Sequence, residues 1–204
     1  MGSGEMRGQS QGAMELDGRR PFPDVIEVVV EIPRGSRNKY EWNERTGTIW
    51  LDRVLSSAVF YNVDYSFVED TRAEDGDHTD ALLLVSEPID PGVHVWARPV
   101  GGLEMTDEHG FDFKVLCVAL GDPQYAHVIG LGDVSPHRLA EIEHFFATYK
   151  LLEDKQVDVV GWRGLDGAHE VLRADRERYL QETSSASAAG ADGHAEAPER
   201  IRGR

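Results

Sequence analysis

The sequence has very little cysteine and no long apolar segment, and each shortage excludes a class of protein. Its single cysteine, Cys117, excludes an internal disulfide framework and a cysteine-rich zinc site. Because Cys117 lies within an apolar segment, it is expected to be a small buried core residue. The longest apolar runs, 81–85 and 115–120, are far shorter than the roughly 20 residues that a membrane-spanning helix needs. We therefore expect neither a transmembrane helix nor a membrane partner.

The sequence also lacks an excess of basic residues. It contains 21 Lys and Arg against 37 Asp and Glu, which gives a formal net charge of −16. This balance argues against nucleic acid as a partner, because phosphate backbones require clustered Lys and Arg. Residues 1–20 and 183–204 are each neutral, so the whole charge lies in residues 21–182. Such an excess of carboxylates is repulsive unless solvent separates them or bound cations neutralise them.

The two ends of the chain differ from its middle in composition. Residues 1–20 contain no apolar segment of the kind found in a secretory signal, which favours a cytoplasmic protein. Residues 183–204 are rich in Ser, Ala and Gly and have too few large apolar side chains to offset the entropy of ordering. We expect one domain at 21–182 between two disordered tails, without internal repeats.

The apolar pattern predicts short strands followed by two helices. The expected strands are 25–32, 39–42, 48–51, 81–85, 93–100 and 114–120, with Pro99 ending the fifth. The first helix begins at Pro136 after the capping residue Ser135. Its apolar face comprises Leu139, Ile142, Phe145, Phe146 and Tyr149. The second helix spans 166–182. These elements predict a β-rich α+β fold, a small closed or nearly closed barrel with helices packed outside.

The most informative segment is the acidic run Asp75-Gly-Asp-His-Thr-Asp80. A charge run of this kind is usually a solvated loop. A calcium loop of the EF-hand type is a second interpretation, but it requires Gly at position 6 and Glu at position 12. Counted from Asp75, these positions hold Asp80 and Ser86, so the calcium-loop interpretation fails.

Two further groups pair carboxylates with basic residues. Asp112 and Lys114 are two apart and point to the same side of an extended chain, as do Lys39 and Glu41. A carboxylate beside an ammonium group suits a site that binds both a hard cation and phosphate. Arg53 could hold phosphate through two hydrogen bonds. A Tyr-Lys pair such as 149–150, at a helix C-terminus, is usually an ordinary surface pair.

Taken together, residues 25–182 closely resemble the soluble family I inorganic pyrophosphatases. The segment Asp75-Gly-Asp-x-x-Asp80 is similar to the signature of that family. Six further segments stand around it in the family's order, at 31–41, 52–53, 60–65, 98–101, 105–114 and 144–150. Each segment alone would be weak, but six in register are specific.

The resemblance implies a five-stranded, OB-like closed barrel with flanking helices, commonly assembled as a hexamer. It implies hydrolysis of inorganic diphosphate to two phosphates with several Mg²⁺ ions per active site, and with Mn²⁺ or other divalent ions as alternatives. The implied metal ligands are Asp75, Asp80, Asp107 and Asp112, with Glu31 and Glu41 holding metal waters. Asp77 resembles the base and Tyr65 lies near the nucleophile, with Tyr61 in the surrounding shell. The phosphate-binding set is Lys39, Arg53, Lys114, Tyr149 and Lys150.

The sequence departs from the family pattern at loop positions. His78 and Thr79 stand where the family has Pro and an aliphatic residue, and Asn62 and Ser66 replace Pro and Gly. Loss of Pro frees φ, so we expect a softer acidic loop. His78 suggests an imidazole ligand that favours Mn²⁺, Co²⁺ or Zn²⁺. A hydrogen-bond partner of the aspartates or an exposed side chain is the commoner role of such a histidine. His109 and His144 are expected to be structural or surface residues.

Two other functions compete with hydrolysis. One is a divergent, low-activity paralogue that binds diphosphate or nucleotide as a sensor or assembly subunit. The retained Asp77 argues against it, because a binding protein has no need of a base. The other is an OB-type module for oligonucleotides, which the net charge and the missing aromatic-basic surface disfavour.

Overall fold

Eight strands and two α-helices make up the part of the chain that the computed structural model describes, residues 21–108, 110–153 and 157–191. The strands are β1 (Ile26–Ile32), β2 (Asn38–Asn43), β3 (Thr48–Val54), β4 (Asp64–Val68), β5 (Asp80–Leu84), β6 (His94–Asp107), β7 (Gly110–Ala119) and β8 (Asp158–Arg163). The helices are α1 (Pro136–Thr148) and α2 (Leu165–Ala191), with short 3₁₀ turns at Pro123–Tyr125, Leu131–Asp133 and Leu151–Glu153.

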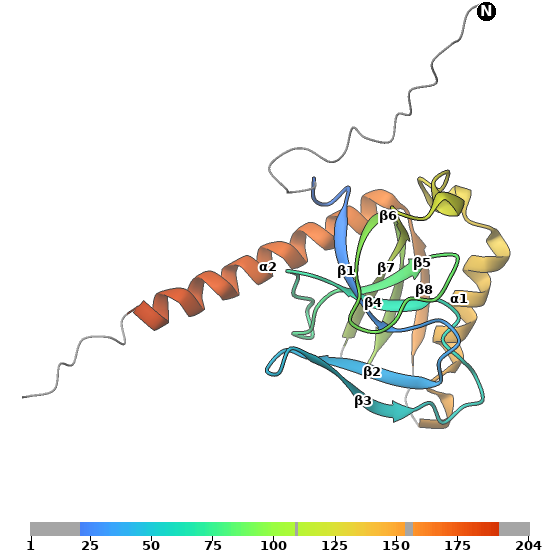
Figure 1. Cartoon of the computed structure of the whole chain (residues 1–204), viewed down its shortest axis with the longest axis horizontal. Helices are drawn as coiled ribbons and strands as arrows, with labels where there is room; N and C mark the ends of the chain where they lie inside the picture. The colour runs from blue at the N-terminus through green and yellow to red at the C-terminus, as the bar shows by residue number, and fades with distance from the viewer. Residues whose placement is uncertain (1–20, 109, 154–156, 192–204) are drawn as a thin grey trace, which may run out of the picture.

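Five of these strands close into a barrel, which confirms the expected five-stranded, OB-like closed barrel (Figure 1). The order is β1-β4-β5-β7-β6, and β6 pairs back onto β1. The pairing is antiparallel except between β5 and β7, which run parallel. Strand β8 adds to β6, while β2 and β3 form a separate hairpin. The fold is therefore β-rich α+β, with a barrel that has no free edge except at β8.

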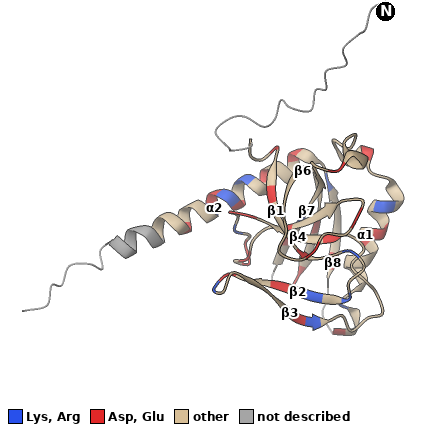
Figure 2. Ribbon diagram, in the orientation of Figure 1, with Lys and Arg blue, Asp and Glu red and all other residues tan. Residues whose placement is uncertain are grey.

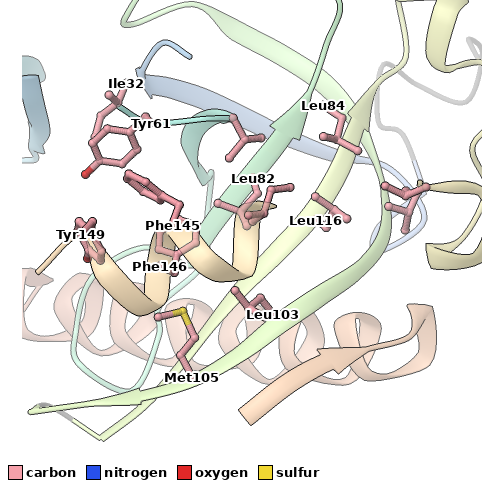
Figure 3. Packing of buried hydrophobic residues seen from close by; sticks show 14 of the residues in the cluster. Ile32, Tyr61, Leu82, Leu84, Leu103, Met105, Leu116, Phe145, Phe146 and Tyr149 are labelled. Atoms are coloured by element: carbon pink, nitrogen blue, oxygen red, sulfur yellow. The ribbon is translucent and has the colours of Figure 1, made fainter. Parts of the chain in front are cut away.

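Alternation along the strands fills two apolar clusters, one covered by each helix. On β5, Leu82 and Leu84 join the cluster that α1 covers, whereas Leu83 joins the one that α2 covers. Both faces of β5 are buried, which explains its continuous apolar sequence. Figure 3 shows the aromatic side chains of α1 packed against aliphatic side chains of the barrel. Cys117 is buried in the α2 cluster, as expected.

Helix α1 follows the predicted pattern. It begins at Pro136 after Ser135, although the Ser135 side chain makes no capping hydrogen bond. Its predicted apolar face is confirmed: Leu139 is half-buried, and the other four side chains, Ile142, Phe145, Phe146 and Tyr149, are buried. This face fixes the C-terminal end of α1 against the barrel.

The expectation that Pro99 ends a strand is wrong. Strand β6 continues through Pro99 to Asp107, and its pairing with β7 is irregular between Pro99 and Gly101. A bulge tolerates proline, since the hydrogen-bond ladder is interrupted there and needs no donor.

Two strands, β4 and β8, carried no clear signal of a strand in the sequence. In β4 the polar Asp64 is buried, where it accepts hydrogen bonds from the backbone of Arg34 at 2.7 Å and Ile89 at 2.9 Å.

Replacement of Gly101 by alanine is expected to destabilise the protein, because the bulge brings other chain segments against this residue. An added Cβ would lie 2.5 Å from Leu131 Cγ and 2.7 Å from the carbonyl oxygen of Arg163, and φ is +157°. Overpacking of this kind costs about 1–3 kcal/mol, measurable by urea denaturation. Gly121→Ala is the control, since nothing lies within 4 Å of its added Cβ. Equal losses in the two variants would refute the close-approach explanation.

Helix α2 is longer than expected. It continues past the predicted end at 182 to Ala191 and projects beyond the barrel (Figure 1). The Ser- and Ala-rich composition that predicted a disordered tail is compatible with a helix, because alanine has the highest helix propensity. Of its expected docking residues, Val171 and Leu172 are buried, whereas Leu180 is 53% exposed. The other expected tail segments, 1–20 and 192–204, lie outside the described residues.

No helix within the described residues is long and apolar enough to span a membrane.

Candidate active site

A cleft of about 450 Å³ lies where the hairpin, the acidic loop and the end of α1 meet the barrel. We call residues 69–79, between β4 and β5, the acidic loop. All of the site residues predicted from the sequence line this cleft: Glu31, Lys39, Glu41, Arg53, Tyr65, Asp75, Asp77, Asp80, Asp107, Asp112, Lys114, Tyr149 and Lys150. Segments far apart in the sequence are therefore gathered at one place.

Lys114 is held between two of these carboxylates. Its Nζ lies 2.6 Å from Asp80 Oδ2 and 2.9 Å from Asp112 Oδ1. Asp112 is two residues earlier on β7 and points to the same side, as predicted. Asp80 comes alongside because β5 and β7 pair in parallel with Ala81 opposite Val115. The parallel register thus brings the last acid of the signature to the acid–lysine pair.

The lysine at this position is buried and charged. Lys114 is only 3% exposed, and its Nζ also donates to the hydroxyl of Tyr65 at 3.2 Å. Burial favours the neutral amine, but Asp112 and Asp80 outweigh it and hold the pKa of Lys114 well above its usual value. The pKa of Tyr65 is also raised well above its usual value, by burial and by the same two carboxylates. Lys114 therefore stays protonated and Tyr65 stays neutral at physiological pH.

Asp80 is the centre of a cluster of mutually repelling carboxylates. Burial, then the charge of Asp80, raises the pKa of Glu31 to about 8. Burial, then the charges of Asp75 and Asp80, raises the pKa of Asp77. The pKa of Asp112 is raised by burial and by Asp80 and Asp107, although Lys114 opposes the change. These shared effects follow from the position of all of these acids in the lining of a single cleft.

The acidic loop turns tightly at its tip. Gly76 has φ of +95°, a conformation that glycine adopts without strain. The backbone N–H of Asp77 donates to Asp75 Oδ1 at 3.0 Å, and that of Ala73 donates to the carbonyl of Asp77 at 2.7 Å. This turn directs Asp75 and Asp77 into the cleft, where both side chains are accessible.

The β2–β3 hairpin contributes alternating acids and bases (Figure 2). Lys39 pairs with Glu41, and its Nζ also lies 3.3 Å from Asp52 Oδ2. Burial opposes the charge of Lys39, but Glu41 and Asp52 outweigh burial and raise its pKa. Arg53 pairs with Asp52 and with Glu153 Oε2 at 2.7 Å. These contacts keep two cations in place at the edge of an acidic cleft.

The Tyr-Lys pair at the end of α1 is part of the cleft and is not an ordinary surface pair. Tyr149 is 6% exposed and stacks on Phe145 with ring centroids 5.1 Å apart. Lys150 Nζ lies 3.1 Å from Asp107 Oδ2. The apolar face of α1 fixes both positions. Tyr61 is buried behind the cleft, 5.7 Å from the ring of Tyr65, which matches a surrounding shell.

His78 is a hydrogen-bonded support and is not available as a metal ligand. Its Nδ1 lies 3.0 Å from the carbonyl oxygen of Thr71, and its Nε2 lies 3.1 Å from Glu44 Oε1. The ring stacks on Phe67 at 4.8 Å. The partner is thus Glu44 rather than an aspartate. His144 is exposed, as expected, and His109 lies outside the described residues.

Three residues at the cleft were not singled out from the sequence: Glu44 and Asp175, which line it, and Glu153, which pairs with Arg53. Asp52, which also lines the cleft, was part of the motif segment 52–53. Glu153 and Asp175 had no local signal, because their partners Arg53 and Thr79 lie about a hundred residues away along the chain.

The donor set of the cleft fits hard divalent cations. Twelve carboxylates and four Lys or Arg side chains line it, so its acids repel one another until cations are added. Mg²⁺ and similar ions take oxygen ligands of this kind. Within the described residues, no three Asp, Glu, His or Cys side chains form a group that could hold a metal as they lie. The ammonium group of Lys114 lies between Asp80 and Asp112 and balances their negative charge.

Comparisons with known proteins give a consistent result. Residues 28–180 match the family described as inorganic pyrophosphatase. The chain is 49% identical over 157 residues to an inorganic pyrophosphatase of Methanosarcina acetivorans, covering 77% of this chain and 94% of that one. It is 48% identical over 147 residues to one of a Nostoc species, covering 72% and 87%. The crystal structure of inorganic pyrophosphatase from Thermus thermophilus matches with a TM-score of 0.77 and 46% identity, over 82% of this chain and 98% of that one.

Proposed function

This chain belongs to the inorganic pyrophosphatase family, and from that premise we propose how its acidic cleft hydrolyses inorganic diphosphate to two phosphates. The protein is an inorganic diphosphatase that depends on divalent metal ions. The observation that carries the assignment of residues is the meeting of carboxylates and buried cations in one cleft. An all-acid cleft would repel diphosphate, and an all-basic one would not retain the metals.

The metal of the proposal is Mg²⁺. Several Mg²⁺ ions would be held directly by Asp75, Asp80, Asp107 and Asp112, and Glu31 and Glu41 would hold their waters. When bound, divalent cations neutralise diphosphate and acidify a water molecule. The oxygen-only donor set supports Mg²⁺ or Mn²⁺ over softer ions, and the hydrogen bonds of His78 remove the one nitrogen donor of the acidic loop.

We propose Asp77 as the general base of the reaction. Its side chain lines the same cleft as Asp75 and Asp80, and burial and these neighbours raise its pKa, which favours acceptance of a proton. It takes the proton of the attacking water, and Tyr65, which stays neutral, offers a hydroxyl near the same place. Lys39, Arg53, Lys114, Lys150 and Tyr149 hold phosphate oxygens and stabilise the charge on the leaving phosphate.

The alternative, a paralogue that only binds diphosphate or nucleotide, has no observation in its favour. The cleft retains the acid proposed as base together with the full set of predicted cations.

We also propose that the protein assembles as a hexamer and is located in the cytoplasm. Exposed apolar side chains such as Trp50, Leu51, Leu151 and Leu152 support self-association, which native mass spectrometry can measure.

Phosphate release from diphosphate tests the proposed function. We expect strong activity with Mg²⁺, weaker activity with Mn²⁺ or Zn²⁺, and complete loss when a chelator removes the metal, because the acids of the cleft then repel the substrate. Restoring Mg²⁺ should restore the rate. A folded protein that binds diphosphate but releases no phosphate with any of these ions would instead support the binding-only alternative.

A further inference from the structure

We propose that Asp175 on α2 is a positioning residue that holds the acidic loop in the conformation presenting Asp75, Asp77 and Asp80 to the cleft. This inference rests on the proposed function of the cleft. The family resemblance gave no role to Asp175, and the acid stands on a different element, close to a hundred positions later in the chain.

Asp175 contacts both ends of the acidic loop. Its Oδ2 accepts a hydrogen bond from Thr79 Oγ1 at 2.7 Å, at the end of the loop. Its carbonyl oxygen accepts one from the backbone N–H of Arg72 at 3.0 Å, near the start. Arg178, one turn later on α2, donates to Asp175 Oδ1 at 2.8 Å and also to the carbonyl of Arg72. A single turn of a regular helix therefore anchors the whole loop.

The base of the loop is buried, whereas its tip is exposed. Thr71, Thr79 and Asp175 are 0%, 1% and 4% exposed, but Asp75 and Asp77 belong to the exposed tip. The hydroxyl of Thr71 donates to the carbonyl of Val68 at 2.7 Å and accepts from the N–H of Thr79 at 3.0 Å. The tip is held together by its own turn and by Arg72, which donates to the carbonyl of Gly76 at 2.7 Å, so its carboxylates are placed as a unit by the buried base.

Thr79 connects Asp175 to the active site through its position in the chain. Thr79 directly precedes Asp80, which lies 2.6 Å from Lys114 Nζ. A threonine hydroxyl, unlike an aliphatic side chain, can donate to a buried carboxylate. The expectation of a soft loop after loss of proline is therefore opposed by a buried, charge-assisted hydrogen bond at Thr79 and by the two contacts of His78.

Asp175 acts through the loop and not on the substrate. Both of its carboxylate oxygens already accept hydrogen bonds, one from Thr79 and one from Arg178. Outer contacts of this kind orient metal ligands, and their loss typically weakens metal affinity or activity by about 10–100-fold. We therefore expect the requirement for metal to report the role of Asp175.

The test compares Thr79→Val, which removes the hydroxyl but keeps the shape, with Thr79→Ser, which keeps the hydroxyl. In Thr79→Val the Mg²⁺ concentration for half-maximal phosphate release should rise about tenfold, with a smaller change in kcat at saturating Mg²⁺. Calorimetric titration of the protein with Mg²⁺ alone should show the same weakening. Amide hydrogens of residues 72–77 should exchange faster. Thr79→Ser should remain close to the wild type in all three measurements.

Ser86→Ala is the matched control. Ser86 Oγ donates to Asp122 Oδ2 at 2.7 Å, an equivalent hydroxyl–carboxylate bond away from the cleft. Its loss should leave the Mg²⁺ requirement and the exchange of residues 72–77 unchanged. Asp175→Asn, which keeps the volume of the side chain, provides a second variant if Thr79→Val does not fold, and it should weaken Mg²⁺ binding in the same direction.

A folded Thr79→Val protein with wild-type Mg²⁺ binding and wild-type loop exchange would overturn the inference, as would an equal effect in Ser86→Ala. Absence of phosphate release in the wild type would count against the proposed function alone. Mg²⁺ titration and hydrogen exchange do not need the reaction, so they would still decide the role of Asp175.

Discussion

Replacement of Asp77 by asparagine is expected to lower kcat for diphosphate hydrolysis by about 10²–10⁴-fold, the range that a positioned general base contributes. The amide keeps the size of the side chain but cannot take a proton from water. Burial and the charges of Asp75 and Asp80 raise the pKa of Asp77, which increases its affinity for a proton. Substrate affinity should change much less than kcat, and steady-state phosphate release separates the two.

Asp70→Asn is the control for this experiment. Asp70 belongs to the same acidic loop but pairs with Arg176 at 3.2 Å and does not line the cleft. It has φ of 55°, which asparagine also tolerates. The control should keep nearly wild-type turnover. Comparable losses in the two variants would mean that acidity of the loop, rather than Asp77 as a base, determines the rate.

Replacement of Lys114 by methionine is expected to affect both stability and activity. Removing one partner of a buried ion pair typically costs about 3–5 kcal/mol, and we expect the lower end of this range, because the side chains of Asp80 and Asp112 remain 29% and 22% exposed. Here Asp80 and Asp112 would face each other without the ammonium between them. The free energy of unfolding of the metal-free protein should fall by that amount, and kcat/KM should fall with it as a phosphate contact is lost.

Added Mg²⁺ should stabilise Lys114→Met more than the wild type, since a divalent ion supplies the missing positive charge. Thermal unfolding with and without Mg²⁺ measures this difference. Arg138→Met is the control, because Arg138 pairs with Glu141 on α1 and does not line the cleft. If metal-free Lys114→Met were as stable as the wild type, Lys114 would not be the counter-charge that holds these carboxylates together.

Much of the fold could be predicted because its signals are local. The two strands of the β2–β3 hairpin and the apolar face of α1 both depend on residues within a few positions of one another. The strand through Pro99 could not be predicted, since proline is a local end signal and the pairing of β6 with three other strands overrides it. The extension of α2 was missed because the same Ser- and Ala-rich composition suits both a tail and a helix.

The candidate site shows the same division. Alternation along an extended chain predicted that Asp112 and Lys114 share a side, and the motif order predicted which residues meet. Glu153 and Asp175 were missed because each supports a residue on another element, and nothing in the neighbouring sequence marks them. The Tyr149-Lys150 pair was ambiguous, since only the packing of α1 decides whether a helix end faces solvent or a cleft.

The parallel pairing of β5 with β7 has a consequence for how the protein acquires activity. Side chains alternate along a strand, so a slip of one residue in this pairing would turn Leu82 and Leu84 out of their cluster and separate Asp80 from Lys114. The same register that completes the hydrophobic interior therefore brings the reactive groups together. During folding, formation of the barrel and maturation of the catalytic centre should occur as one cooperative event.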